Sequence, residues 1–190
     1  MKRFAPEQLR RFLEVVDGHL DQSAEITLIG GSALAIGYGV GRATNDIDTY
    51  ESELRAVEHA AHLARATTGL QIPIANSTVA QVPAGAEDRR RRVLKSLTRL
   101  VVFVVDPHDL AASKLLRGNE HDRAQLAELH SLEPLFQDVL VARFADLLID
   151  YVGDPTEPRW ALVHFVEETW GELAGLEARR AMGLGRSTSR

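Results

Sequence analysis

The segment ITLIGGSALAIGYGVGRATNDIDTY, residues 26–50, restricts the fold more than any other part of the chain. It opens with β-branched and apolar residues, Ile26 to Gly30, which predict a short strand ended by glycine. Helix formers follow in GSALAIGYG, residues 31–39, before a glycine-punctuated loop that reaches Ala43. DIDTY, residues 46–50, alternates polar and apolar side chains, as a strand with one solvent-facing side does. The segment therefore predicts strand, tight turn, short helix, loop and second strand.

The remaining chain is read from the same periodicities. Helical spacing of apolar residues predicts helices over 6–20, 52–70, 132–152 and 158–182, and two helices within 106–130 separated by Gly118-Asn119. Short strands are predicted at 72–74 and 78–82, and paired strands at 91–97 and 99–105, the last apolar enough to be buried on both faces in the middle of a sheet. The fold class expected is α/β (α+β), with a small mixed sheet flanked by helices and a helical C-terminal extension.

Length and composition limit the organisation. A chain of 190 residues suits one functional unit, and we expect a core over 1–130, a helical extension over 131–182 and a disordered tail over 183–190. No cysteine is present, which excludes disulfides and thiolate chemistry. No apolar run reaches the roughly 20 residues of a membrane span and no signal peptide is apparent, so a cytoplasmic location without membrane contact is expected.

The two aspartates of the segment carry the chemistry. Asp46 and Asp48 stand two residues apart on a strand, so their carboxylates are expected on one face, where like charges are costly unless a cation lies between them. Magnesium is the natural ion, since it takes carboxylate oxygens together with substrate phosphates and water. Upstream, the backbone amides of Gly30 and Gly31 at a helix start, with the Ser32 hydroxyl, are suited to a phosphate. The two halves fit one ligand, a metal-bound triphosphate.

The segment resembles the signature of the DNA polymerase β-like nucleotidyltransferase superfamily, in which a GG or GS turn precedes a DxD-type strand. The spelling R-x-T-x-D-I-D at Arg42, Thr44, Asp46 and Asp48 is similar to small nucleotidyltransferases grouped with abortive-infection (AbiEii-like) and toxin–antitoxin proteins. A second block, VVDPHDLAASKLLRGNEHDRAQLAEL, resembles their P-x-D-L-x-x-x-K-L-x-x-x-R-x-x-D segment. Together the two blocks cover roughly residues 26–129.

The resemblance implies roles for residues in both blocks. Asp46 and Asp48 are expected to bind Mg2+, with Mn2+ as a substitute, and Asp122 to add an acidic group. Lys114 and Arg117 are expected to contact the nucleotide phosphates, and the expected nucleotide-binding set is completed by Gly30, Gly31, Ser32, Arg42 and Thr44. Lys114, Arg117 and Asp122 can converge if the second helix of the block folds back on the first. The expected catalytic residues are Asp46, Asp48, Lys114 and Asp122.

One departure from the superfamily pattern concerns the third metal-binding carboxylate. Larger members carry it on a later core strand, but RLVVFVV, residues 99–105, contains none. Either Asp122 takes its place from a helix, a single magnesium ion suffices, or the chain has lost activity. Asp109 is a weaker substitute, because it is expected at a helix N-cap.

The function expected is magnesium-dependent transfer of a nucleoside monophosphate from a nucleoside triphosphate to a hydroxyl of tRNA or protein, in a toxin-like enzyme with an antitoxin partner. The run Arg89 to Arg92 is either a phosphate-contacting surface for a nucleic acid or a charged strand edge that blocks aggregation. Two alternatives remain open: an antibiotic nucleotidyltransferase, and a catalytically silent nucleotide- or RNA-binding module.

Overall fold

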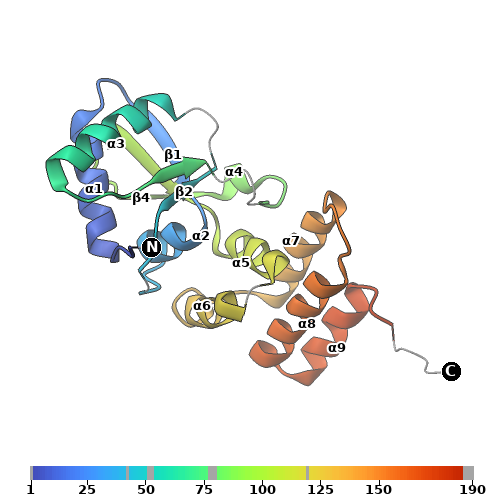
Figure 1. Ribbon diagram of the computed structural model, residues 1–190. Coiled ribbons are helices and arrows are strands. Elements are labelled where there is room, and N and C mark those ends of the chain that lie inside the picture. The colour runs from blue at the N-terminus through green and yellow to red at the C-terminus, as the bar shows by residue number, and fades with distance from the viewer. Residues whose placement is uncertain (1, 42, 51–53, 77–80, 119, 186–190) are drawn as a thin grey trace. The chain divides into compact units, whose positions relative to one another are not determined.

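The computed structural model describes residues 2–41, 43–50, 54–76, 81–118 and 120–185, without the side chains of Glu120 and His121. The chain forms two compact units. The sheet unit comprises residues 1–80 and 87–106, and the helical unit comprises residues 81–86 and 107–190. Figure 1 labels most elements of both units.

The described residues of the sheet unit form five strands in the order β3-β2-β1-β5-β4. Their bounds are β1 (Ala24–Leu28), β2 (Ile47–Thr49), β3 (Ile74–Asn76), β4 (Arg91–Val93) and β5 (Leu100–Val104). The pairs β1–β5 and β2–β3 are parallel, while β1–β2 and β4–β5 are antiparallel. The sheet is therefore mixed, and the α/β (α+β) fold class predicted from the sequence is confirmed.

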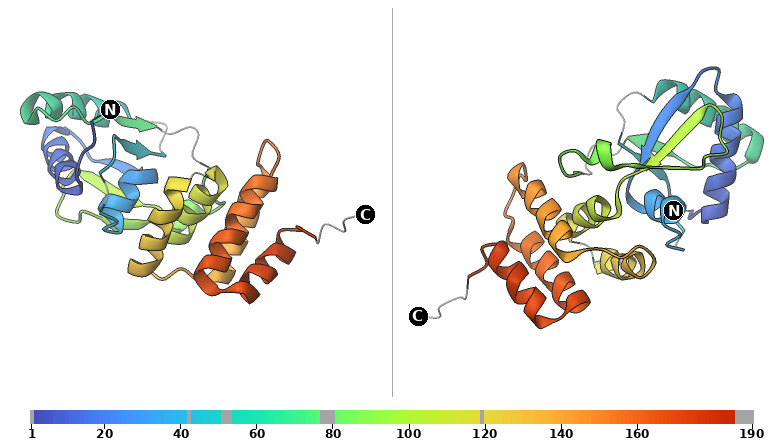
Figure 2. Two further views of the ribbon diagram at one scale, coloured as in Figure 1. Left: turned by 60° about the horizontal axis from the view of Figure 1, so that its bottom comes forward. Right: turned by 180° about the vertical axis from the view of Figure 1, so that it is seen from behind.

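The longer helices of the sheet unit are α1 (Pro6–His19), α2 (Gly30–Gly37) and α3 (Arg55–Thr68). Pro6 occupies the first turn of α1, where its missing N–H costs nothing, and the backbone N–H of Ala5 donates to Gln8 Oε1 at 2.9 Å. The buried residues of α1 recur every three or four positions, so one apolar stripe faces the unit. Helices α1 and α3 lie side by side in all the views of Figures 1 and 2.

Asp17 near the end of α1 fastens this helix to the start of β5. Its carboxylate accepts hydrogen bonds from the backbone N–H groups of Thr98, Arg99 and Leu100, at distances of 2.6 to 3.1 Å, and from the Thr98 hydroxyl at 3.2 Å. Burial alone raises the pKa of Asp17, but these donors outweigh it and hold the pKa below the usual value of 3.8. A single side chain thus fixes the register of the helix against the sheet.

The strand predictions hold in part. The pairing of the strands within 91–97 and 99–105 is confirmed, and β5 lies between β1 and β4. Val101 and Phe103 are only half-buried, so the prediction that this strand is buried on both faces is wrong. The strand predicted over 72–74 is found slightly later, as β3. Of the strand predicted over 78–82, residues 78–80 lie outside the described residues, and Gln81 and Val82 are in no strand.

The helical unit contains α5 (Pro107–Arg117), α6 (Glu120–Leu132), α7 (Gln137–Ile149), α8 (Thr156–Trp170) and α9 (Glu172–Ala181), while the single turn α4 (Ala86–Arg89) falls at the division between the units. The two helices predicted within 106–130 are confirmed. The single helix predicted over 158–182 is wrong, because Gly171 adopts φ 93° and ψ 173° and ends α8. Helices α8 and α9 consequently pack side by side (Figure 2).

The division between the units falls after Asp106, whereas the sequence places a boundary at residue 130. Helices α5 and α6 therefore belong to the same compact unit as α7 to α9. The functional boundary at residue 130 stays a prediction. Most of the tail predicted over 183–190 lies outside the described residues, although Leu184 N–H still donates to Arg179 O at 3.0 Å. Among the described residues, none of the helices combines the length and apolar character that crossing a bilayer requires.

Candidate functional site

The glycine turn lies where β1 gives way to α2. Ile29 is still extended, with φ −129° and ψ −179°, and Gly30 then adopts φ 58°, which L side chains rarely tolerate. The Ala33 N–H donates to Ile29 O at 3.1 Å, as in the first turn of an α-helix. The backbone N–H groups of residues 30–32 therefore stand in the positions that an α-helix leaves without an intrahelical partner.

The turn is packed directly against the aspartate strand. Ile29 N–H donates to Asp48 O at 3.1 Å, and a Cβ atom added at Gly30 would lie 3.1 Å from Asp48 Oδ2. A Cβ atom added at Gly31 would lie 2.8 Å from Thr44 Oγ1, closer than real side chains approach. Two successive glycines are thus required because the carboxylate of Asp48 and the hydroxyl of Thr44 occupy the space beside them.

The hydroxyl of Ser32, which is predicted to donate to a phosphate, is hydrogen-bonded to the protein backbone. Its side chain is buried, and its hydroxyl donates to Ile29 O at 2.9 Å and lies 3.4 Å from Asp48 O. In the described structure this hydroxyl joins the turn to β2. Its predicted contact with a nucleotide stays a prediction.

The loop before β2 carries the other polar groups of the motif. Thr44 Oγ1 lies 3.4 Å from Asp46 Oδ1, and the buried Asn45 Oδ1 has no hydrogen-bond partner among the described residues. Asp46 directly precedes β2 and Asp48 is the middle residue of that strand, both half-buried. Arg42, also predicted to bind the nucleotide, lies outside the described residues. That the two carboxylates share one face stays a prediction.

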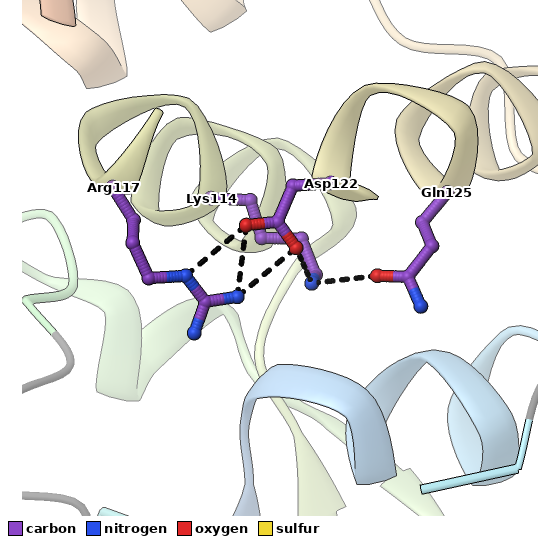
Figure 3. Close-up of polar contacts among 4 residues, drawn as sticks. All are labelled: Lys114, Arg117, Asp122 and Gln125. Atoms are coloured by element: carbon purple, nitrogen blue, oxygen red, sulfur yellow. Dashed lines mark hydrogen bonds and ion pairs between the residues drawn. The ribbon is translucent and has the colours of Figure 1, made fainter. Parts of the chain in front are cut away.

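A second polar cluster lies within the helical unit, between α5 and α6 (Figure 3). Lys114 Nζ donates to Asp122 Oδ1 at 2.7 Å and to Gln125 Oε1 at 3.0 Å. The Arg117 guanidinium donates to both carboxylate oxygens of Asp122, at distances of 2.9 to 3.1 Å. The prediction that Lys114, Arg117 and Asp122 converge when α6 folds back is therefore correct in geometry.

Burial separates the two cations of this cluster. The side chains of Lys114 and Asp122 are only 4% and 6% exposed, whereas that of Arg117 is 57% exposed. A buried carboxylate held by a buried ammonium is strongly coupled to it, because either charge alone would be left unpaired in a poorly solvated place. Both carboxylate oxygens of Asp122 already accept hydrogen bonds from these cations, which makes them less available to a metal ion.

Asp109 is also placed differently from the sequence prediction. It is the third residue of α5 rather than its N-cap, it is fully buried, and Arg143 Nε of α7 lies 3.4 Å from its Oδ1. Helix α5 begins at Pro107, so Asp106 and not Asp109 directly precedes its first residue. Asp109 is accordingly part of the packing between α5 and α7.

The arginine run is largely engaged inside the sheet unit. Arg90 Nη1 lies 2.6 Å from Glu25 Oε1 and donates to Thr27 Oγ1, and its guanidinium stacks 4.2 Å from the ring centroid of Phe103. Arg91 donates to Asp106 Oδ2 at 3.4 Å. Two of the four arginines therefore bind groups of their own unit, which weakens the interpretation of the run as a surface for nucleic acid.

Three residues that adjoin the predicted site residues were not predicted from the sequence. Gln125 stands three residues after Asp122, so helical spacing was the signal that could have found it. Asn45 lies between two predicted site residues. Phe4 exchanges backbone hydrogen bonds with Thr44, a contact across forty positions that no local pattern marks.

Among the described residues, no group of three or more histidine, aspartate or glutamate side chains is arranged to hold a metal ion. A metal-binding role for Asp46 and Asp48 stays a prediction. The glycine turn, the Thr44 hydroxyl and the Asp48 carboxylate lie close together where β1 ends beside β2.

Comparison with known proteins gives one match and two negative results. Residues 7–152 match a family described as nucleotidyltransferase of unknown function (DUF6036). Neither the curated proteins nor the solved structures include a match to the chain. The matched range covers the glycine turn, the aspartate pair and the Lys114–Asp122 cluster, whereas α8 and α9 fall beyond it. Because the match covers well over half of its residues, the chain belongs to this nucleotidyltransferase family.

Proposed function

We propose that this protein transfers a nucleoside monophosphate from a nucleoside triphosphate to a hydroxyl acceptor, with magnesium bound by Asp46 and Asp48. The observation that carries the proposal is the packing of the glycine turn on the aspartate strand, where Asp48 and Thr44 lie beside Gly30 and Gly31. Backbone donors for phosphate and carboxylates for its metal thereby adjoin each other. Membership of a nucleotidyltransferase family supports the same reaction class.

The donor set fits a magnesium ion. Two carboxylates, completed by substrate phosphate oxygens and water, make the hard oxygen environment that this ion takes in nucleotide enzymes. The side-chain oxygen of Asn45, the residue before Asp46, is buried with no hydrogen-bond partner among the described residues. A buried acceptor of this kind is normally satisfied by a ligand or water. When bound, the ion would offset charge on the triphosphate.

The protein's own residues would supply binding and orientation. The N–H groups at the start of α2 form the positive end of the helix dipole, which favours a phosphate there. The Ser32 hydroxyl joins this turn to β2, and the Thr44 hydroxyl lies beside both Gly31 and Asp46. In the transfer, the acceptor oxygen forms a bond to the α-phosphorus, the bond from that phosphorus to the bridging oxygen breaks, and pyrophosphate leaves while the hydroxyl proton passes to solvent.

Of the two acceptors that the resemblance implies, the charges favour a protein hydroxyl over tRNA. Residues 1–106 contain 13 basic and 13 acidic residues, while residues 107–190 contain 9 basic and 14 acidic residues. An acidic helical unit repels a polyanion. Arg90 and Arg91, which would have offset this repulsion, are bound within the sheet unit. The toxin-like role and the antitoxin partner remain part of this proposal.

For the second cluster, we propose that Asp122 orients Lys114 and Arg117 rather than binding the metal. Its two oxygens already accept hydrogen bonds from both cations, and Gln125 holds Lys114 from the other side. Magnesium would then be bound by two protein carboxylates. This is the second of the three alternatives left open by the missing strand carboxylate.

The test is nucleotide transfer by the purified full chain. With magnesium and each labelled nucleoside triphosphate in turn, wild-type protein should label a protein acceptor from a cell extract, and the double variant Asp46→Asn with Asp48→Asn should not. Asp21→Asn, an exposed aspartate in the turn after α1, is the matched control and should label normally. Continued labelling by the double variant would contradict the proposed site.

A silent nucleotide-binding module is the second candidate. It is favoured by the absence, among the described residues, of any cluster of three acidic or histidine side chains able to hold a metal. Calorimetry with magnesium and a nucleoside triphosphate distinguishes the two. Binding that depends on Asp46 and Asp48, without pyrophosphate release in the presence of any acceptor fraction, would favour the silent module.

A further inference from the structure

The loop that leads into the aspartate strand is rich in glycine. Between the end of α2 and Thr44 it contains Gly39, with φ 69°, and Gly41, and neither has any atom within 4 Å of the position where a Cβ would stand. Val40, between the two glycines, is fully buried and its N–H donates to Leu34 O at 3.1 Å, so the start of the loop is held to α2. Glycines lose the most conformational freedom on ordering, so the end of the loop at Thr44 needs a tie of its own.

Phe4 provides that tie. Its N–H donates to Thr44 O at 2.7 Å, and Thr44 N–H donates back to Phe4 O at 3.1 Å. This mutual exchange is an isolated antiparallel bridge between the segment before α1 and the loop. The Phe4 side chain is only 2% exposed and is among the largest buried side chains, so the N-terminal half of the bridge is anchored in the core of the sheet unit.

Thr44 transmits this anchoring to the candidate site. Its hydroxyl lies 2.8 Å from the position of a Cβ at Gly31 and 3.4 Å from Asp46 Oδ1. A displaced Thr44 would therefore disturb both the phosphate turn and the first aspartate. We infer that Phe4 is a positioning residue of the candidate site, which sets the loop at Thr44 to Asp46 through backbone pairing without touching the ligand.

This inference rests on the proposed function, and the experiment separates the two. Phe12 in α1 is the matched control, because it is the same residue type, is fully buried and belongs to the same unit. Phe4→Ala and Phe12→Ala are compared in the full chain, with Phe4→Leu and Phe12→Leu as milder pairs if an alanine variant fails to fold. Stability of each variant is measured by urea denaturation.

The first readout is magnesium–ATP affinity by calorimetry. Groups that orient metal ligands from behind typically change metal affinity by about 10- to 100-fold when removed. Phe4→Ala should therefore weaken binding by roughly 10-fold or more, Phe4→Leu should recover part of it, and Phe12→Ala should weaken it by less than about 2-fold. Equal weakening by the Phe4 and Phe12 variants of matched stability would overturn the inference.

The second readout needs no ligand. Hydrogen exchange of the peptide covering Thr44 to Asp48 should accelerate in the Phe4 variants and remain at the wild-type rate in the Phe12 variants. Unchanged exchange in Phe4→Ala would overturn the positioning role whether or not nucleotide binds. Wild-type protein that fails to bind magnesium–ATP would contradict the proposed function alone.

Discussion

Replacing Asp122 by asparagine should destabilise the protein far more than the loss of a surface carboxylate. The Lys114 and Asp122 side chains are 4% and 6% exposed and their charged atoms are 2.7 Å apart. Removing one partner of such a pair leaves the other charge buried and costs about 3–5 kcal/mol. Arg117 adds little, because its side chain is 57% exposed and exposed ion pairs contribute about 1 kcal/mol or less.

A double-mutant cycle tests this magnitude. Lys114→Met combined with Asp122→Leu removes both charges at similar volume, which is often nearly neutral for buried pairs. We therefore expect Asp122→Asn to cost about 3–4 kcal/mol, the double variant to cost much less than the sum of its single changes, and the coupling energy to approach about 3 kcal/mol.

The measurement is urea denaturation followed by circular dichroism, with Asp146→Asn in α7 as control. Asp146 is exposed, so its replacement should change the free energy of unfolding by less than about 0.5 kcal/mol. Single changes that simply add in the double variant would refute the coupling. A stable Asp122→Asn protein that loses magnesium–nucleotide binding would instead show that the carboxylate serves the ligand.

Two further predictions concern the sheet unit. Asp17→Asn should cost about 1–2 kcal/mol at neutral pH, because charge-assisted hydrogen bonds to three N–H groups are weakened in a partly exposed site. Folding lowers the pKa of Asp17, so the extra stability of wild type over Asp17→Asn is full above pH 3.8 and shrinks as the pH falls through the lower folded pKa. Thermal unfolding of both proteins at several pH values will measure this difference. A stability difference that grows on acidification would contradict the assignment. Gly31→Ala should weaken magnesium–ATP binding by about 10-fold or more, because its methyl group would lie 2.8 Å from Thr44 Oγ1. Gly18→Ala, at a helical position with nothing within 4 Å, is the control and should bind normally while gaining up to about 1 kcal/mol of stability, as unfolding and calorimetry will check.

Local spacing was sufficient to predict the elements that frame the candidate site. The strand, turn, helix and strand over residues 24–49 follow from β-branched residues, glycines and alternation, all of which act within a few positions. The convergence of Lys114 with Asp122 was predictable for the same reason, since a short turn between two helices brings residues eight apart together. Helix α9 was not predicted as a separate element because the φ angle of a glycine inside an apolar pattern cannot be read from the sequence.

Other features required the tertiary structure. No sequence period marks the exchange between Phe4 and Thr44 or the bonds from Asp17 to residues 98–100, because these partners are 40 and more than 80 positions apart. The use of Arg90 within its own unit was equally hidden, since a run of arginines has the same composition at a binding surface and against Glu25.

The sequence by itself determined which residue types stand at the candidate site and why two glycines and two aspartates share one segment. Only the tertiary structure decided that Asp48 and Thr44 fill the space beside those glycines. It also decided that Phe4 pairs with the loop before β2 at Thr44. The physical reason is that periodicity specifies which face of an element is buried, whereas the identity of the neighbour on that face depends on chain closure over long separations.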